Sequence, residues 1–147
     1  MLIATVVVAA VAMSPAMRDA LPRSAPLLTE RTPVAASAAL CEIAPSDARV
    51  YQDFVFASYQ IWACPRLMGF ADTRLYPFPD ELWDDYRLIA RGGEGWSETL
   101  DRYAVTHLLL SAQAQPLAVE RARAEPCWNS VYRDTRAEIF ERSCPPG

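Results

Sequence analysis

Short apolar runs alternate along the chain with segments of helical periodicity, and this alternation predicts an α/β fold. The predicted strands are residues 49–51, 66–71 and 105–110, which are short, mostly apolar runs between turn signals. The predicted helices are residues 33–41, 53–64, 79–91, 95–104 and 116–125, most of which are bounded by Asp, Pro or Gly. Strands that alternate with helices in this way form a parallel sheet with right-handed crossovers.

The last segment, residues 127–144, predicts an antiparallel hairpin. Trp128, Ser130 and Tyr132 alternate along its first half, and the turn lies near Asp134. The fold class that we predict is therefore α/β: a small, mostly parallel sheet with crossover helices and a C-terminal antiparallel hairpin.

The predicted strand at 66–71 is apolar without alternation, which is typical of a strand that is buried on both faces. Asp72 and Arg74 follow it, and would stand at the carboxyl end of the strand, where open α/β sheets keep their binding crevices. One hypothesis is a crevice for a polar ligand at this corner. The other, which we favour, is an ion pair between Asp72 and Arg74 that fixes the corner.

The amino end, residues 1–17, is uncharged and almost wholly apolar. Its length is at the lower limit for a helix that crosses a hydrocarbon core of roughly 30 Å, and we predict a single transmembrane anchor. A secretory signal peptide cleaved at Ser14-Pro15-Ala16 is the first alternative, although no Lys or Arg precedes the apolar residues. A buried core helix is the second. Residues 18–32 would then form a linker, and residues 33–147 an extracytoplasmic domain.

Composition limits the partners of the chain. Hydrophobic residues make up 52% of the 147 residues, which argues against disorder. The net charge is −4 and the isoelectric point is near 5.0, so the sequence provides no basic face. We therefore do not expect nucleic acid to bind.

Four cysteines in a chain of this length are compatible with two disulfides. Cys41 and Cys64 each end a predicted helix and should lie at the amino edge of the parallel strands. Cys127 begins the hairpin. Counting back from the turn, the residue opposite Cys127 on the second strand falls between Arg142 and Cys144. We predict the pairs Cys41–Cys64 and Cys127–Cys144, which need an oxidising compartment. Unpaired buried thiols and a four-cysteine zinc site are the alternatives, but no C-x-x-C spacing supports zinc.

Catalytic candidates are weak. His107 is the only histidine and lies in an apolar strand without an activating Ser or Cys nearby, so we interpret it as a packed strand residue. Gly92, Gly93 and Gly95 follow a helix rather than a strand, which favours a connector between helices over a phosphate-binding loop. We expect no enzymatic activity, no cofactor and no metal.

Four segments, ARVYQDFVFASYQIW, GFADTRLY, ETLDRYAVTHLLL and PCWNSVYRDTRAEIFER, together suggest a family. Their order resembles the C-terminal extracytoplasmic domain of multi-pass bacterial membrane proteins that are similar to polytopic lipid-linked glycosyltransferases. In that family an aromatic-rich helix, an Asp-Gly-Arg corner and a Trp-initiated hairpin follow one another, and Thr73 stands at the Gly of the corner. The resemblance spans residues 32–142. It implies a membrane-attached extracytoplasmic domain but not sugar transfer, because the matching residues exclude the multi-span portion.

Three functions are compatible with these features. We favour a non-enzymatic accessory or structural subunit in the bacterial inner membrane, with its domain on the periplasmic side. Its partners would be the lipid bilayer and the integral membrane subunits of a larger complex, for example an energy-transducing or light-harvesting one. The alternatives are a detached domain that binds a glycan or a lipid-linked substrate, and a freestanding secreted binding module.

The orientation of the domain rests on two opposing signals. Arg18, Arg23 and Arg31 follow the apolar segment and by themselves would favour a cytoplasmic domain. The four cysteines favour the periplasmic side, and we give them more weight.

Overall fold

The computed structural model describes residues 28–29, 31–73 and 78–145. It divides the chain after residue 30, and the fold is that of the unit Arg31–Gly147. The predicted anchor at 1–17 and most of the predicted linker at 18–32 lie outside the described residues. Among the described helices, none combines the length and the apolar character that a membrane crossing requires.

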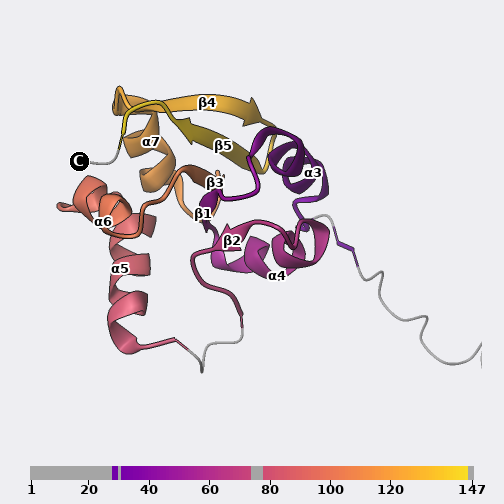
Figure 1. The fold of residues 1–147 in the computed structure, drawn as a ribbon, viewed down its shortest axis with the longest axis horizontal. Helices are drawn as coiled ribbons and strands as arrows, with labels where there is room; N and C mark the ends of the chain where they lie inside the picture. Colours follow the sequence, from indigo (N-terminus) through magenta and orange to yellow (C-terminus); the bar gives the residue numbers. More distant parts are fainter. Residues whose placement is uncertain (1–27, 30, 74–77, 146–147) are drawn as a thin grey trace, which may run out of the picture. The chain divides into compact units, whose positions relative to one another are not determined.

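Helices and strands alternate as the α/β prediction requires, and their order can be followed in Figure 1. The elements are α3 (Val34–Ile43), β1 (Arg49–Gln52), α4 (Phe54–Ala63), β2 (Met68–Gly69), α5 (Asp80–Ala90), α6 (Trp96–Arg102), β3 (His107–Ser111), α7 (Pro116–Ala124), β4 (Trp128–Arg133) and β5 (Ala137–Arg142). The mixed α/β class and the C-terminal hairpin are therefore confirmed.

The five described strands form one sheet in the order β2-β1-β3-β5-β4. β1 pairs in parallel with β2 on one side and with β3 on the other. β5 is antiparallel to both β3 and β4. The described sheet is thus evenly mixed rather than mostly parallel, because the hairpin joins it through its second strand.

β3 is the central strand, and the sheet is covered on both faces. Leu108 and Leu110 pack in one core with side chains of α5, α6 and α7, whereas Leu109 packs in a second core with side chains of α3 and α4. All residues of β3 are buried. Two groups of helices, one on each face of the sheet, explain why this strand is apolar without alternation (Figure 1).

The central strand predicted at 66–71 is wrong in both length and place. β2 contains only Met68 and Gly69, pairs with β1 alone and forms one edge of the sheet. Met68 is 59% exposed, while Leu67 and Ala71 are buried. The order of the crossovers explains the difference: β1 has β2 on one side and β3 on the other, and only β3 is continued by the hairpin. An edge strand of two residues leaves few unpaired backbone groups with which another chain could form hydrogen bonds.

The hairpin has its predicted position, but a β-bulge changes which side chains share a face. The register shifts between Ser130 and Tyr132, so Val131 is an extra residue on β4. Trp128 packs in the core under α5, α6 and α7, and Tyr132 packs against the opposite core. The prediction that Trp128, Ser130 and Tyr132 lie on one side is therefore wrong at Tyr132, because the extra residue inverts the alternation.

The structure confirms Asp53 as the N-cap of α4, but the helix buries a different face from the predicted one. The Asp53 carboxylate accepts a hydrogen bond from the Val55 N–H at 2.8 Å. The spacings of seven and eight residues from Phe54 to Ile61 and Trp62 predict that these three apolar residues face inward, whereas the buried residues are Phe56, Ala57 and Gln60. Apolar residues occupy nearly every side of this helix, so periodicity alone does not define its buried face.

The glycines between α5 and α6 form a helix–helix connector, as predicted. Gly92 has a φ of +58° just after Arg91, the C-cap of α5, and Gly95 has a φ of +80° at the N-cap of α6. A Cβ at Gly92 would lie 3.0 Å from the Leu117 carbonyl oxygen of α7. Glycine is therefore required at residue 92 both for its backbone conformation and for close packing.

Candidate interaction surface

The structure contains both predicted disulfides, Cys41–Cys64 and Cys127–Cys144, with Cα–Cα distances of 5.7 and 5.1 Å. Both distances are ordinary for a disulfide. All four cysteines of the chain lie in the described ranges, and none of them is free. The two alternatives, buried free thiols and a zinc site, are therefore wrong.

Both disulfides lie at the amino ends of the parallel strands. One links α3, which leads into β1, to the C-cap of α4, which leads into β2. The other joins the two open ends of the hairpin, beside the pair Trp128–Arg142. Because His107 at the start of β3 lies opposite Glu141 near the end of β5, the amino ends of the parallel strands and the open end of the hairpin lie at the same end of the sheet. The carboxyl ends of the parallel strands lie at the opposite end of the sheet.

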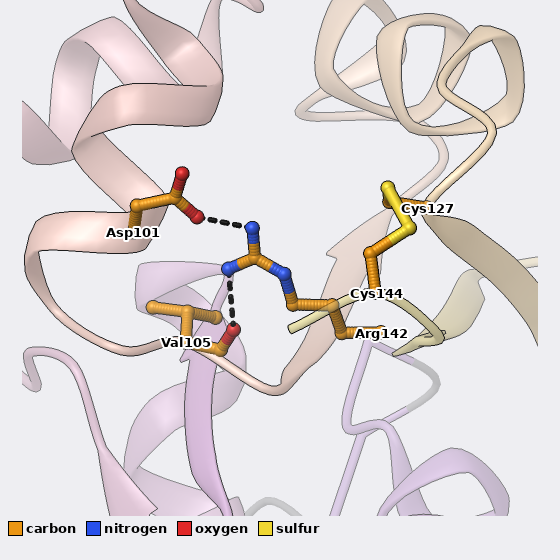
Figure 2. The surroundings of a disulfide bond; sticks show 5 residues. All are labelled: Asp101, Val105, Cys127, Arg142 and Cys144. Carbon is orange, nitrogen blue, oxygen red and sulfur yellow. Dashed lines mark hydrogen bonds and ion pairs between the residues drawn. A yellow bond between two sulfur atoms is a disulfide. The ribbon is translucent and has the colours of Figure 1, made fainter. Parts of the chain in front are cut away.

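The second disulfide adjoins a buried cluster around Arg142 (Figure 2). The guanidinium of Arg142 forms an ion pair with Asp101 and donates a hydrogen bond to the Val105 carbonyl oxygen at 3.5 Å. It also lies over the Trp128 ring, with its Cζ 5.5 Å from the ring centroid. The cluster joins α6, the start of β3 and the hairpin, so we assign it to stability.

The two disulfides indicate an oxidising, extracytoplasmic location for the domain. Cytosolic thiols are kept reduced, and disulfides persist in the periplasm and outside the cell.

The predicted polar corner is only partly described. Asp72 is buried, 4% exposed, and follows β2 at the edge of the sheet rather than a central strand. Arg74 lies outside the described residues, so neither the ligand hypothesis nor the ion-pair hypothesis is tested. The backbone just before Asp72 is held by Gln52, whose Nε2 donates to the Ala71 carbonyl oxygen at 3.0 Å and whose Oε1 accepts from the Phe70 N–H at 3.2 Å.

His107 is a buried strand residue, in agreement with the sequence. Its Nδ1 lies 2.9 Å from the Thr106 hydroxyl oxygen, and its Nε2 has no hydrogen-bond partner among the described residues. Burial lowers the pKa of the imidazole, against the opposing charge of Glu141. The neutral form of His107 is thus favoured.

A polar network at the carboxyl ends of β1 and β3 is not apparent in the sequence. Gln115, just before α7, donates through Nε2 to the hydroxyls of Tyr51 and Tyr86 at 3.0 and 3.2 Å. The Tyr86 hydroxyl also accepts from the Phe54 N–H at 2.8 Å. Burial raises the pKa of Tyr86 to about 12, so its hydroxyl stays protonated. These residues come from three distant segments, at residues 51–54, 86 and 115, which no local spacing connects.

The outward side of α4 carries large apolar side chains. Trp62 is 74% exposed, Val55 62% and Ile61 37%. Tyr59 is half-buried, and its ring centroid lies 5.5 Å from that of Trp62. Val55, Tyr59 and Trp62 follow a spacing of four and three residues, which aligns them along one side of a helix. We call these four residues the α4 face. Scattered apolar residues are normal on a surface, but an aligned cluster is typical of an interaction site.

Comparisons of the chain with protein-family models, curated proteins and solved structures found no match. The resemblance to the extracytoplasmic domain of lipid-linked glycosyltransferase-like membrane proteins therefore stays a prediction.

Proposed function

We propose that the chain is a non-enzymatic accessory subunit, anchored in the bacterial inner membrane, whose periplasmic domain packs against a larger integral membrane complex. The observation that carries this proposal is the α4 face, with Trp62 74% exposed and Val55 62% exposed. Tryptophan and tyrosine dominate the energetics of protein interfaces because their rings bury a large area at low entropic cost.

Two features support the periplasmic side and the nearby membrane. The paired cysteines fit an oxidising compartment. The apolar segment at 1–17 would hold the domain near the bilayer, since residues 18–30 can extend over at most about 45 Å. A surface that lies so close to membrane proteins gains local concentration for a weak contact.

The α4 face is suited to a protein partner with an apolar surface. Burying a large apolar side chain contributes about 1.5–3 kcal/mol. Trp62, with its Tyr59 neighbour, would form the centre of the contact, Val55 would extend it along the helix, and Ile61 would widen it around the helix. Charged residues are absent from these four positions, as in the core of an interface.

The test is purification of the tagged full chain from native membranes in mild detergent. We expect integral membrane subunits in fixed stoichiometry with the chain, and Trp62→Asp should remove them. Leu117→Asp is the matched control, because Leu117 is 56% exposed on α7, on the other side of the sheet from α4. A chain that appears alone in the soluble fraction, or a complex that survives Trp62→Asp unchanged, would contradict the proposal.

A further inference from the structure

A groove of about 430 Å³ opens at the carboxyl ends of β1 and β3. This volume falls within the range of small-molecule sites. After β1 the chain enters α4, which packs on one face of the sheet, and after β3 it enters α7, which packs on the other. Such a divergence between neighbouring parallel strands is where open α/β sheets bind ligands. The groove is lined by residues of both connections, Asp53 and Gln115, and by α5.

Three aromatic rings line the groove: Phe54 of α4, and Trp83 and Tyr86 of α5. Each pair of rings is steeply inclined, at 75°, 70° and 69°, with centroid separations of 5.7, 6.5 and 5.9 Å. The three rings pack edge to face on one another, and all of them line the groove. A ring face attracts a cation within about 6 Å of its centroid, so an ammonium group bound in the groove would lie against these rings.

A carboxylate lines the same groove. Asp53 is 3% exposed, and its Oδ1 accepts the capping hydrogen bond from the Val55 N–H. Within the described part of the chain, no arginine or histidine forms an ion pair with Asp53. Arg87 also lines the groove, but it is more than half exposed and its guanidinium pairs with Asp84. A buried carboxylate without a counter-charge is costly, and a bound cation would offset that cost.

Neutral acceptors and donors complete the lining. The Oε1 atom of Gln115 is buried and has no hydrogen-bond partner among the described residues. The Tyr86 hydroxyl accepts two hydrogen bonds, from Phe54 and Gln115. An unpaired buried oxygen at a groove is a common sign of a missing partner.

We infer that this groove binds a small organic cation that carries a quaternary or methylated ammonium group. The ammonium group lies before the rings of Phe54, Trp83 and Tyr86, and the Asp53 carboxylate supplies the counter-charge. Val55 of the α4 face also lines the groove, but Trp62 does not, and the inference does not depend on the proposed packing function.

The test is a titration of the purified full chain with choline chloride at constant ionic strength, followed by the indole NMR signal of Trp83, which Trp83→Phe assigns. We expect saturable binding. The uncharged isostere 3,3-dimethyl-1-butanol should bind at least about fivefold more weakly, because it has the same shape without the charge. Asp53→Asn should weaken choline binding by a similar factor, and Trp83→Ala by more.

The control variant is Trp62→Ala, which removes an exposed ring outside the groove and should leave choline binding unchanged. Asparagine is also a good N-cap, so Asp53→Asn keeps the start of α4, and its circular dichroism spectrum should match that of the wild type. The inference is overturned if choline does not bind, if its isostere binds equally well, or if Asp53→Asn has no effect. Tighter binding of glucose than of choline would also overturn it and indicate a saccharide site.

Discussion

Trp128 and Arg142 lie opposite each other across the β4–β5 pair, and the guanidinium of Arg142 lies over the Trp128 ring, with its Cζ 5.5 Å from the ring centroid. The same guanidinium pairs with Asp101 of α6. The Trp96 and Trp128 rings also pack edge to face, with their centroids 6.0 Å apart. Two residues of the hairpin thus connect the sheet, α6 and the adjacent disulfide, which makes this contact a principal support of the domain.

Trp128→Ala should lower the free energy of unfolding by about 3–5 kcal/mol, the usual range for removal of a buried aromatic ring. Trp128 is 5% exposed, and its loss would leave a cavity beneath Arg142 and Trp96. Urea unfolding followed by circular dichroism measures the change. Trp62→Ala is the control, because Trp62 is 74% exposed, and its loss should stay within about 0.5 kcal/mol. Equal losses in the free energy of unfolding for Trp128→Ala and Trp62→Ala would contradict the burial of Trp128.

Both disulfides should stabilise the domain. The pairs span 23 and 17 residues, and a loop of about 15 residues contributes roughly 3 kcal/mol by the chain-entropy estimate. Reduction should therefore lower the melting temperature, and should have no effect on a variant with all four cysteines replaced by serine. Peptide mapping without reductant should recover Cys41–Cys64 and Cys127–Cys144. Four free thiols in the protein from its native membrane would contradict the extracytoplasmic location.

Tyr86→Phe should cost about 1–3 kcal/mol of stability, although it removes one oxygen atom only. The Phe54 N–H and the Nε2 of Gln115 would lose the Tyr86 hydroxyl as an acceptor, at the carboxyl ends of β1 and β3. Thermal unfolding provides the measurement. Tyr59→Phe is the matched control, since the Tyr59 hydroxyl has no hydrogen bond within the described part of the chain. If Tyr86→Phe unfolds at the same temperature as the wild type, the prediction is wrong and water replaces the lost hydroxyl without a loss of stability.

Asp53→Asn should be at least as stable as the wild type near pH 7. Burial raises the pKa of the Asp53 carboxyl, against hydrogen bonds from the Val55 and Phe56 N–H groups. A pKa that is higher in the folded state means that the free energy of unfolding falls as the pH rises from the unfolded pKa through the folded pKa. Asparagine keeps the cap and does not ionise.

Denaturant unfolding at several pH values tests this expectation. The advantage of Asp53→Asn should be largest at neutral pH and should disappear in acid, where both side chains are neutral. A variant that is less stable than the wild type at neutral pH would contradict it, and would indicate that the carboxylate is stabilised by its capping role.

The disulfides were predictable because two local features determine them. A hairpin turn near Asp134 brings Cys127 close to Cys144. The bulge at Val131 does not prevent this pairing, because the two cysteines lie at the open end of the hairpin. Cys41 and Cys64 each lie at the end of a helix that leads into a parallel strand, which brings both of them to the end of the sheet where these strands begin. The hairpin argument does not need the order of the strands, whereas the Cys41–Cys64 argument assumes that β1 and β2 are neighbours, which they are.

The edge position of β2, the buried face of α4 and the groove were not predictable. The order of the strands places β2 at the edge, and it depends on which strand the hairpin joins. In α4, polar Gln60 is buried and apolar Trp62 is exposed, so hydropathy indicates the wrong face. The groove combines Asp53, Trp83 and Gln115, which only the opposite directions of the crossovers bring together.

The most direct test of the proposed function is site-specific photo-cross-linking from the α4 face in native membranes. A photoreactive phenylalanine analogue replaces Trp62 in one variant and Leu117 in the other, since both side chains are more than half exposed. The proposal predicts that residue 62 forms one discrete cross-link to an integral membrane protein, identified by mass spectrometry, and that residue 117 does not. Cross-links from residue 62 to no protein, or the same products from both positions, would contradict it.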